Sequence, residues 1–236
     1  SDNTVTAAKI GSNAVTAAKF NADVISGQTA LSSAPADTDE FLVSDAGVLK
    51  RIDYSLIKGG GAYTKLLSTT VSSGVSEVAF NSTYITSTYT DYKIIIQNLL
   101  GASEADFRLY ISTDNGSSFK DGFKYGVQGV DSNNGTAISN NDTEDAGFIS
   151  ISGGSALRAE ADANAYFEIN LFGHSDTASC VSAHITGGYE NNSGRGVVVR
   201  GYGFDNETPR TFNYVKVAFN SGNIDKGFFT LYGRSV

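Results

Sequence analysis

The chain has 236 residues and a formal net charge of −8, and it is rich in glycine (26), phenylalanine (14) and tyrosine (12) but poor in proline (2). Abundant glycine and aromatic residues with few charges favour strands and turns over helices. The acidic charge disfavours binding to nucleic acid or to an anionic membrane, because both need clustered Lys and Arg. No apolar run approaches the roughly 20 residues that cross a bilayer. We therefore expect no membrane insertion, and the first twenty residues lack the pattern of a signal peptide.

The chain opens with a ten-residue repeat, SDNTVTAAKI followed by GSNAVTAAKF, in which six of the ten positions are identical. A unit this short cannot bury its own apolar side chains. We therefore expect residues 1–20 to form a shaft or anchor segment whose apolar residues contact sister chains or another protein. These oligomer or anchor contacts are Val5, Ile10, Val15 and Phe20. A continuous helix is opposed by the Thr, Val, Gly and Asn of the repeat, although short helical turns joined by extended pieces fit it as well.

Residues 21–58 have the pattern of a small β-hairpin module. Phe41–Ser44 is a short strand, Asp45–Gly47 a turn, and Val48–Asp53 the returning strand. The glycines at 59–61 indicate a hinge between this module and the rest of the chain. We expect residues 62–236 to form one domain.

Short strands separated by turn residues fill this last domain. The expected strands are 65–71, 76–80, 91–99, 106–113, 123–130, 146–152, 164–172, 178–186, 196–204, 211–219 and 227–233. Three of them alternate clearly, with an apolar residue at every second position. The alternating sets are Phe107, Leu109, Ile111; Phe167, Ile169, Leu171; and Val215, Val217, Phe219. The fold predicted is all-β, a jelly-roll-like antiparallel β-sandwich preceded by the repetitive segment and the hairpin module.

Metal or catalytic chemistry would most naturally involve Cys180, His174 and His184. Cys180 and His184 are four residues apart on one expected strand, about 13 Å at ~3.3 Å per residue, which is too far to share a zinc ion or to form a nucleophilic pair. The acidic stretch Asn140–Asp145 could supply oxygen ligands to a calcium ion near Asp142, or it could be a solvated loop. Nothing singles out a catalytic pair among the 25 acidic residues. We expect no enzyme activity, no cofactor and no metal site, with the calcium question left open.

Aromatic residues in or beside turn-rich segments are the best candidates for ligand binding. They are Tyr84, Tyr89, Phe123, Tyr125, Tyr189 and Tyr202. Aromatic faces stack on sugar rings, and neighbouring Asn or Asp side chains hydrogen-bond to hydroxyl groups. Packing at the edge of the core or at an interface is the alternative role for each of them.

Several passages of the chain resemble virion fibre proteins of tailed bacteriophages, particularly phages of marine bacteria. The run NTVTAAKIGSNAVTAAKF looks like the repeats in fibre shafts, and PADTDEFLVSDAGVLKRIDYS is similar to a small module that follows such repeats. LLSTTVSSGVSEVAF, NSTYITSTYTDYKIIIQNL, FRLYISTDNGSSF and FNSGNIDKGFFTLYGRSV look like parts of a virion domain. The resemblance covers most of the chain and is weakest from Gly129 to Asn164. It implies a virion location and trimerisation, and it carries over no catalytic residue.

Three functions are compatible with this sequence. The first is a trimeric tail fibre, anchored to other virion proteins by its first residues, whose distal sandwich attaches to a polysaccharide or outer-membrane protein of the host. The second is a capsid (head) fibre or decoration protein. The third is an enzyme that cleaves surface glycans, which would need a deep cleft and a defined acid pair.

Overall fold

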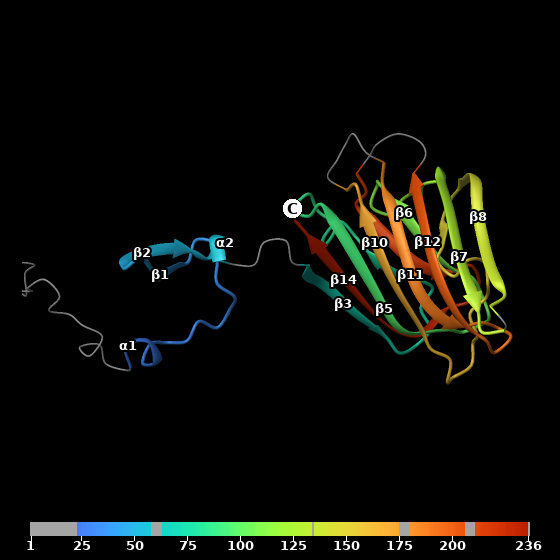
Figure 1. Ribbon diagram of the computed structural model, residues 1–236, viewed down its shortest axis with the longest axis horizontal. Helices are drawn as coiled ribbons and strands as arrows, with labels where there is room; N and C mark the ends of the chain where they lie inside the picture. Colours follow the sequence, from blue (N-terminus) through green and yellow to red (C-terminus); the bar gives the residue numbers. More distant parts are fainter. Residues whose placement is uncertain (1–22, 58–62, 134, 175–179, 206–210, 236) are drawn as a thin grey trace, which may run out of the picture. The chain divides into compact units, whose positions relative to one another are not determined.

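The computed structural model describes residues 23–57, 63–133, 135–174, 180–205 and 211–235 (Figure 1). The chain divides into two compact units, Ser1–Gly59 and Gly60–Val236, and the boundary falls within the glycine run at 59–61. The repeat with Val5, Ile10, Val15 and Phe20 lies outside the described residues, as does the expected hinge. Within the described ranges, no helix is both long and apolar enough to cross a bilayer.

The first unit contains a two-stranded hairpin flanked by two helical turns. The elements are α1 (Asp23–Ser26), β1 (Glu40–Asp45), β2 (Val48–Asp53) and α2 (Tyr54–Ile57). Strands β1 and β2 pair antiparallel from Glu40↔Asp53 to Asp45↔Val48. The connection is Ala46-Gly47, and both residues have positive φ, at 50° and 82°. This is the geometry of a two-residue type I′ turn, which matches the twist of the flanking strands. The predicted hairpin is confirmed.

The second unit is an antiparallel β-sandwich of two unequal sheets, and the predicted all-β sandwich is thereby confirmed. Figure 1 shows the strands of the larger sheet side by side. In order across the eight-stranded sheet they are β3 (Thr64–Val71), β14 (Ile224–Arg234), β5 (Asp91–Gly101), β10 (Ala165–Phe172), β11 (Ser182–Glu190), β12 (Gly196–Asp205), β7 (Phe123–Asp131) and β8 (Ala137–Ala146). The four-stranded sheet runs β4 (Val78–Phe80), β13 (Tyr214–Phe219), β6 (Phe107–Ser112), β9 (Ile149–Ser150).

A continuous apolar core fills the space between the two sheets. All nine residues of the three alternating sets are buried, with Phe107, Phe167 and Val217 at 0% exposure. The Phe107 ring on β6 stacks on the Phe167 ring on β10, with centroids 5.8 Å apart, so this contact bridges the small and the large sheet. Phe107 also contacts Phe219, at 5.0 Å between centroids. The period-2 pattern of the sequence therefore predicts the inner faces correctly.

The structure differs from the prediction in one added strand and in several boundaries, of which those of β11 and β9 change most. Residues 137–146 form β8, an edge strand paired only with β7, where the prediction had a loop at Asn140–Asp145. An edge strand needs few apolar residues, and polar or charged side chains there protect it against pairing with other chains. The side chains of residues 140–146 lie outside the described part of the structure. Strand β11 spans 182–190 in place of 178–186, and β9 contains only Ile149 and Ser150.

Candidate binding surface

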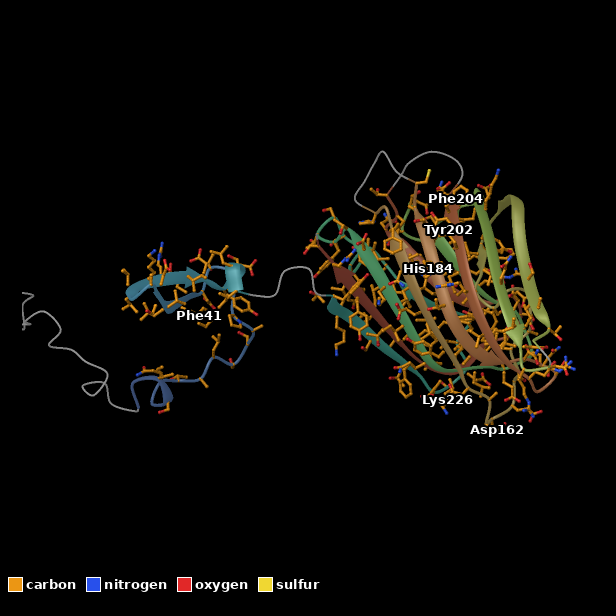
Figure 2. The ribbon with its side chains drawn as sticks, in the orientation of Figure 1. Phe41, Asp162, His184, Tyr202, Phe204 and Lys226 are labelled. Carbon is orange, nitrogen blue, oxygen red and sulfur yellow. The ribbon has the colours of Figure 1, made fainter. Side chains whose placement is uncertain are left out.

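The outer face of the eight-stranded sheet carries the candidate site. In β12 every second residue is buried, so Val197, Val199 and Gly201 face the core. The residues between them, Val198, Arg200 and Tyr202, point away from it. Figure 2 labels Tyr202, Phe204 and His184 on the strands of this sheet. Val198 is 65% exposed and Tyr202 is 51% exposed, so this part of the outer face is not covered by the small sheet or by loops.

Two adjoining hollows lie on this face between β7, β12 and β11. One has a volume of about 290 Å³, and its lining residues are Gly126, Gln128, His184, Arg200, Gly201 and Tyr202. The other has a volume of about 310 Å³, and its lining residues are Gln128, Gly129, Val130, Val198, Val199 and Arg200. Gln128 and Arg200 line both hollows, and they are direct cross-strand partners in the β7–β12 register. We call the two hollows together the outer groove.

A glycine opens the floor of the outer groove. Gly126 on β7 is the cross-strand partner of Tyr202 on β12, which in turn pairs with His184 on β11. A β-carbon placed on Gly126 would meet no atom within 4 Å. Because Gly126 has no side chain, no β-carbon stands opposite Tyr202, which is 51% exposed and whose ring contacts Phe204 with centroids 6.1 Å apart.

The groove combines an aromatic ring with hydrogen-bonding groups. Arg200 is exposed and, within the described residues, makes no ion pair. On the same face Lys93 is paired, since its Nζ lies 2.8 Å from Glu168 Oε1. This ion pair, together with the hydrogen bond from Asn170, lowers the pKa of Glu168. Arg200 is therefore an available cation beside an exposed aromatic ring and the Gln128 amide.

The six predicted aromatic residues occupy different positions. Phe123, Tyr125 and Tyr189 are buried, with exposures of 1%, 6% and 4%. Tyr84 and Tyr89 are partly buried and pack against the core. Tyr202 alone of the six lies in the outer groove. For Phe123, Tyr125 and Tyr189 the expected surface position is corrected, because strand alternation turns these rings inward. The Tyr189 hydroxyl donates to the Ser152 carbonyl at 2.6 Å, and burial raises the pKa of Tyr189 to about 12.

The three residues considered for metal or nucleophile chemistry are separated in the fold. His184 lines the outer groove, His174 is 4% exposed inside the sandwich, and Cys180 is a half-buried free thiol. In the part of the chain that is described, no three His, Cys, Asp or Glu side chains converge on a position that could hold a metal ion.

A separate hollow of about 370 Å³ adjoins His174, and Ile85, Thr86 and Phe212 are among its lining residues. The His174 Nε2 atom lies 3.0 Å from the Thr86 carbonyl oxygen, so Nε2 carries the proton and donates it. The other ring nitrogen, Nδ1, is buried without a hydrogen-bond partner among the described residues. The ring packs edge-on against Phe212, with centroids 4.7 Å apart. These contacts fit a core histidine that stays neutral.

We expect His174 to make the sandwich less stable as the pH falls below about 6.5. Burial lowers the pKa of His174 from 6.5, outweighing the backbone contacts with Thr86 and Phe212 that raise it. The unfolded chain then binds a proton that the folded chain resists, so the free energy of unfolding decreases as the pH drops from about 7 toward 5. The loss is about 1.4 kcal/mol for each unit by which the pKa is lowered.

Urea unfolding at several pH values measures this effect. His174→Gln keeps a donor for the Thr86 carbonyl but does not titrate, so the pH slope of the variant is expected to be shallower than that of the parent chain. The variant loses packing at every pH, but that loss is constant and leaves the slope interpretable. Equal slopes in the two proteins would contradict the assignment of the effect to His174.

The sequence analysis does not identify four outward side chains of the outer groove, Gln128, Val130, Val198 and Arg200, nor the glycine at its floor, Gly126. Their signal is the alternation in residues 196–204, where Gly201 and Gly203 face inward and place Arg200, Tyr202 and Phe204 outward. The sequence places Tyr202 in or beside a turn-rich segment, whereas in the structure it lies within the paired strand β12.

Comparison with models of protein families, with curated proteins and with solved structures found no match to this chain.

Proposed function

We propose that the chain is a non-enzymatic structural subunit of a bacteriophage virion, a trimeric tail fibre whose β-sandwich attaches to the host surface through the outer groove. The observation that carries this proposal is the contrast between the two units. The sandwich has a complete core, but none of residues 25–57 is buried. A unit without a core of its own is expected in an assembly, where neighbouring copies cover its apolar side chains.

The hairpin unit exposes large apolar residues on both of its faces. Leu42 and Leu49 lie on one face, with exposures of 74% and 70%. Phe41 and Val48 lie on the other, with exposures of 41% and 58%. An isolated two-stranded hairpin is at best marginally stable in water. A dimer formed through one face would leave the other exposed, whereas a closed ring uses two different faces of every copy. This supports the trimer.

The shape and lining of the outer groove support a role in adhesion. The groove is shallow and open, and its ring, guanidinium and amide groups suit stacking and hydrogen bonding to a sugar polymer. Three copies in one fibre present three such grooves. When several weak sites bind one surface together, the avidity can exceed the single-site affinity by roughly 10²–10⁴-fold.

The trimer can be tested with charges placed in the hairpin. We expect the parent chain to have a solution mass near three times the 24.8 kDa of one chain. The double substitution Leu42→Glu and Leu49→Glu puts two carboxylates where apolar contacts are expected, and should lower the mass toward 24.8 kDa. Light scattering after size-exclusion chromatography measures this. Thr38→Glu, at an exposed position before β1, is the control that should leave the mass unchanged. A parent chain that is monomeric at working concentrations would contradict the trimer.

Attachment is tested by adding the labelled full chain to a panel of marine bacterial strains. We expect the chain to bind the strains that the parent phage infects and to compete with virions for adsorption. If it binds none of the susceptible strains, the adhesion role is wrong. A map of the virion that locates the chain on the capsid would replace the tail fibre with the head-fibre or decoration role.

A further inference from the structure

The charge of the outer groove is opposite in sign to the charge of the whole chain. The formal net charge is −8. Among the described residues that line the two hollows there is no Asp or Glu, and Arg200 lines both hollows. An exposed guanidinium with no partner in the described residues is a ready site for an anionic group. The planar fork of Arg matches the two oxygens of a carboxylate.

The spacing of the groove residues matches one sugar unit. Tyr202 and Arg200 are at positions i+2 and i on the same face of β12, so their backbone positions are about 7 Å apart. A pyranose ring stacked on Tyr202 in the space above Gly126 would reach toward Arg200. A hexuronic acid carries its carboxylate directly on a ring carbon, so the carboxylate would lie near the guanidinium while the ring stays on the tyrosine.

The second hollow adjoins the first at Gln128 and Arg200 and adds apolar side chains to the groove. Besides Gln128 and Arg200, which line both hollows, its outward side chains are Val130 and Val198, a cross-strand pair with exposures of 50% and 65%. The C–H face of a neighbouring sugar can pack on such a pair, while Gln128 can hydrogen-bond to its hydroxyl groups. Both hollows are open, so a chain of sugars can lie across them without an end being enclosed.

From these observations we propose that the outer groove binds an acidic polysaccharide, with Tyr202 stacking on a hexuronic acid ring and Arg200 binding its carboxylate. This rests on the proposed adhesion function and names the chemistry of its ligand. Arg200 is the one Arg or Lys among the described lining residues, and together with the acidic net charge it favours a polymer with sparse carboxylates. A densely sulfated polymer would place several anions against a surface that offers one guanidinium and repels the rest.

The ligand test compares the binding of each acidic polymer with the binding of an uncharged form of the same polymer. Polygalacturonate, alginate and hyaluronate are used in their acid form and after chemical reduction of their carboxyl groups, and binding to the full chain is measured by biolayer interferometry. We expect at least one acid polymer to bind roughly tenfold more tightly than its reduced form, the size of one charge-assisted hydrogen-bonding contact. Dextran sulfate is included to distinguish sulfate from carboxylate.

The protein variants separate charge from shape. Arg200→Gln should bind the acid polymer no better than its reduced form. The preference of Arg200→Lys for the acid polymer should lie between those of Arg200→Gln and the parent chain, because lysine keeps the charge but cannot bind both carboxylate oxygens as the planar guanidinium does. Gly126→Val fills the space beside Tyr202 and should abolish binding to both forms. Its matched control is Gly196→Val, which also has an outward position on a strand with no atom within 4 Å of the added β-carbon, but lies at the far end of β12. Both valine variants should unfold at or above the parental temperature.

The outcomes distinguish an error in the proposed ligand from an error in the proposed adhesion function. If no acid polymer is preferred over its reduced form, or if dextran sulfate binds more tightly than every uronate, the carboxylate assignment is overturned. If the chain still binds host cells in that case, the adhesion function stands. If Gly196→Val weakens binding as much as Gly126→Val does, the ligand does not occupy the outer groove. A chain that binds neither cells nor polymers would overturn both proposals.

Discussion

Replacing Asp106 by alanine is expected to lower the free energy of unfolding of the sandwich by about 3–5 kcal/mol. Asp106 is 9% exposed and directly precedes β6. Its Oδ1 atom accepts hydrogen bonds from the hydroxyls of Ser150 and Ser152, at 2.8 and 2.6 Å. Its Oδ2 atom accepts one from Nε of Arg108, at 2.8 Å. One carboxylate therefore holds three donors from two parts of the chain.

The large effect follows from what the alanine would leave behind. Ser150 and Ser152 are both 0% exposed, so their hydroxyls would lose this acceptor inside the protein. Each buried polar group without a partner costs roughly 1–3 kcal/mol. Ser152 also binds two further groups, because its hydroxyl accepts from the Phe107 N–H at 3.2 Å and its carbonyl accepts from Tyr189. The loss would therefore spread to the contacts of β6 and β11.

Urea unfolding tests this prediction, because a less stable variant has a lower midpoint urea concentration. An unchanged dependence of the free energy of unfolding on urea would indicate that the native and unfolded states keep their compactness. Asp106→Asn retains one oxygen acceptor and should lose less than Asp106→Ala. Asp162→Ala, in an exposed turn before β10, is the control and should change the stability by less than about 0.5 kcal/mol. An Asp106→Ala variant as stable as this control would show that the network contributes nothing.

Local signals made the hairpin and the core strands predictable. The hairpin depends on Ala46-Gly47, two residues between two short strands, and the positive φ at both positions is a property of that turn alone. The alternation of Phe107, Leu109 and Ile111 is likewise contained in one strand. Such features need no information from distant parts of the chain, and for this reason the sequence predicts them well.

The direction in which Tyr125 and Tyr202 point could not be predicted in this way. Each tyrosine lies next to glycine in the sequence, and each faces a glycine across the β7–β12 pair, Tyr125 opposite Gly203 and Tyr202 opposite Gly126. Yet Tyr125 is 6% exposed and Tyr202 is 51% exposed. A shift by one residue in a strand exchanges its two faces. Which face of a strand meets the second sheet depends on the whole sandwich. The sequences around the two tyrosines are alike, so they do not show which ring is buried.

The outer groove depends on pairing over a long distance in the chain. Gln128 and Arg200 come together only because β7 pairs with β12, and β11 brings His184 beside Tyr202. Strand β8 illustrates the same limit, since its polar sequence forms a strand through pairing with β7 and not through a pattern of its own. Residues that build a binding surface on a sheet are thus hidden until the strand order is known.

Replacing Gly187 by alanine is expected to destabilise the sandwich by about 3 kcal/mol, although it adds a single carbon. A β-carbon at Gly187 would lie 2.2 Å from Cδ1 of Phe167 and 2.6 Å from the carbonyl oxygen of Tyr166. Phe167 cannot move away, because its ring stacks on Phe107 at 5.8 Å and contacts Tyr189 at 5.9 Å between centroids. The strand β11 would have to move, and with it the position of His184 in the outer groove.

The matched control is Gly196→Ala on the neighbouring strand β12, where an added β-carbon meets no atom within 4 Å. Alanine has less conformational freedom than glycine in the unfolded chain, so less entropy is lost on folding. This variant should therefore be unchanged or more stable by about 0.4–1 kcal/mol. Thermal unfolding separates the two, because about 3 kcal/mol corresponds to roughly 6–12 °C in a domain of this size. If both variants unfold at the same temperature, the close packing of Phe167 against β11 does not limit the stability of the sheet. In that case the groove would rest on a more adaptable scaffold than these contacts indicate.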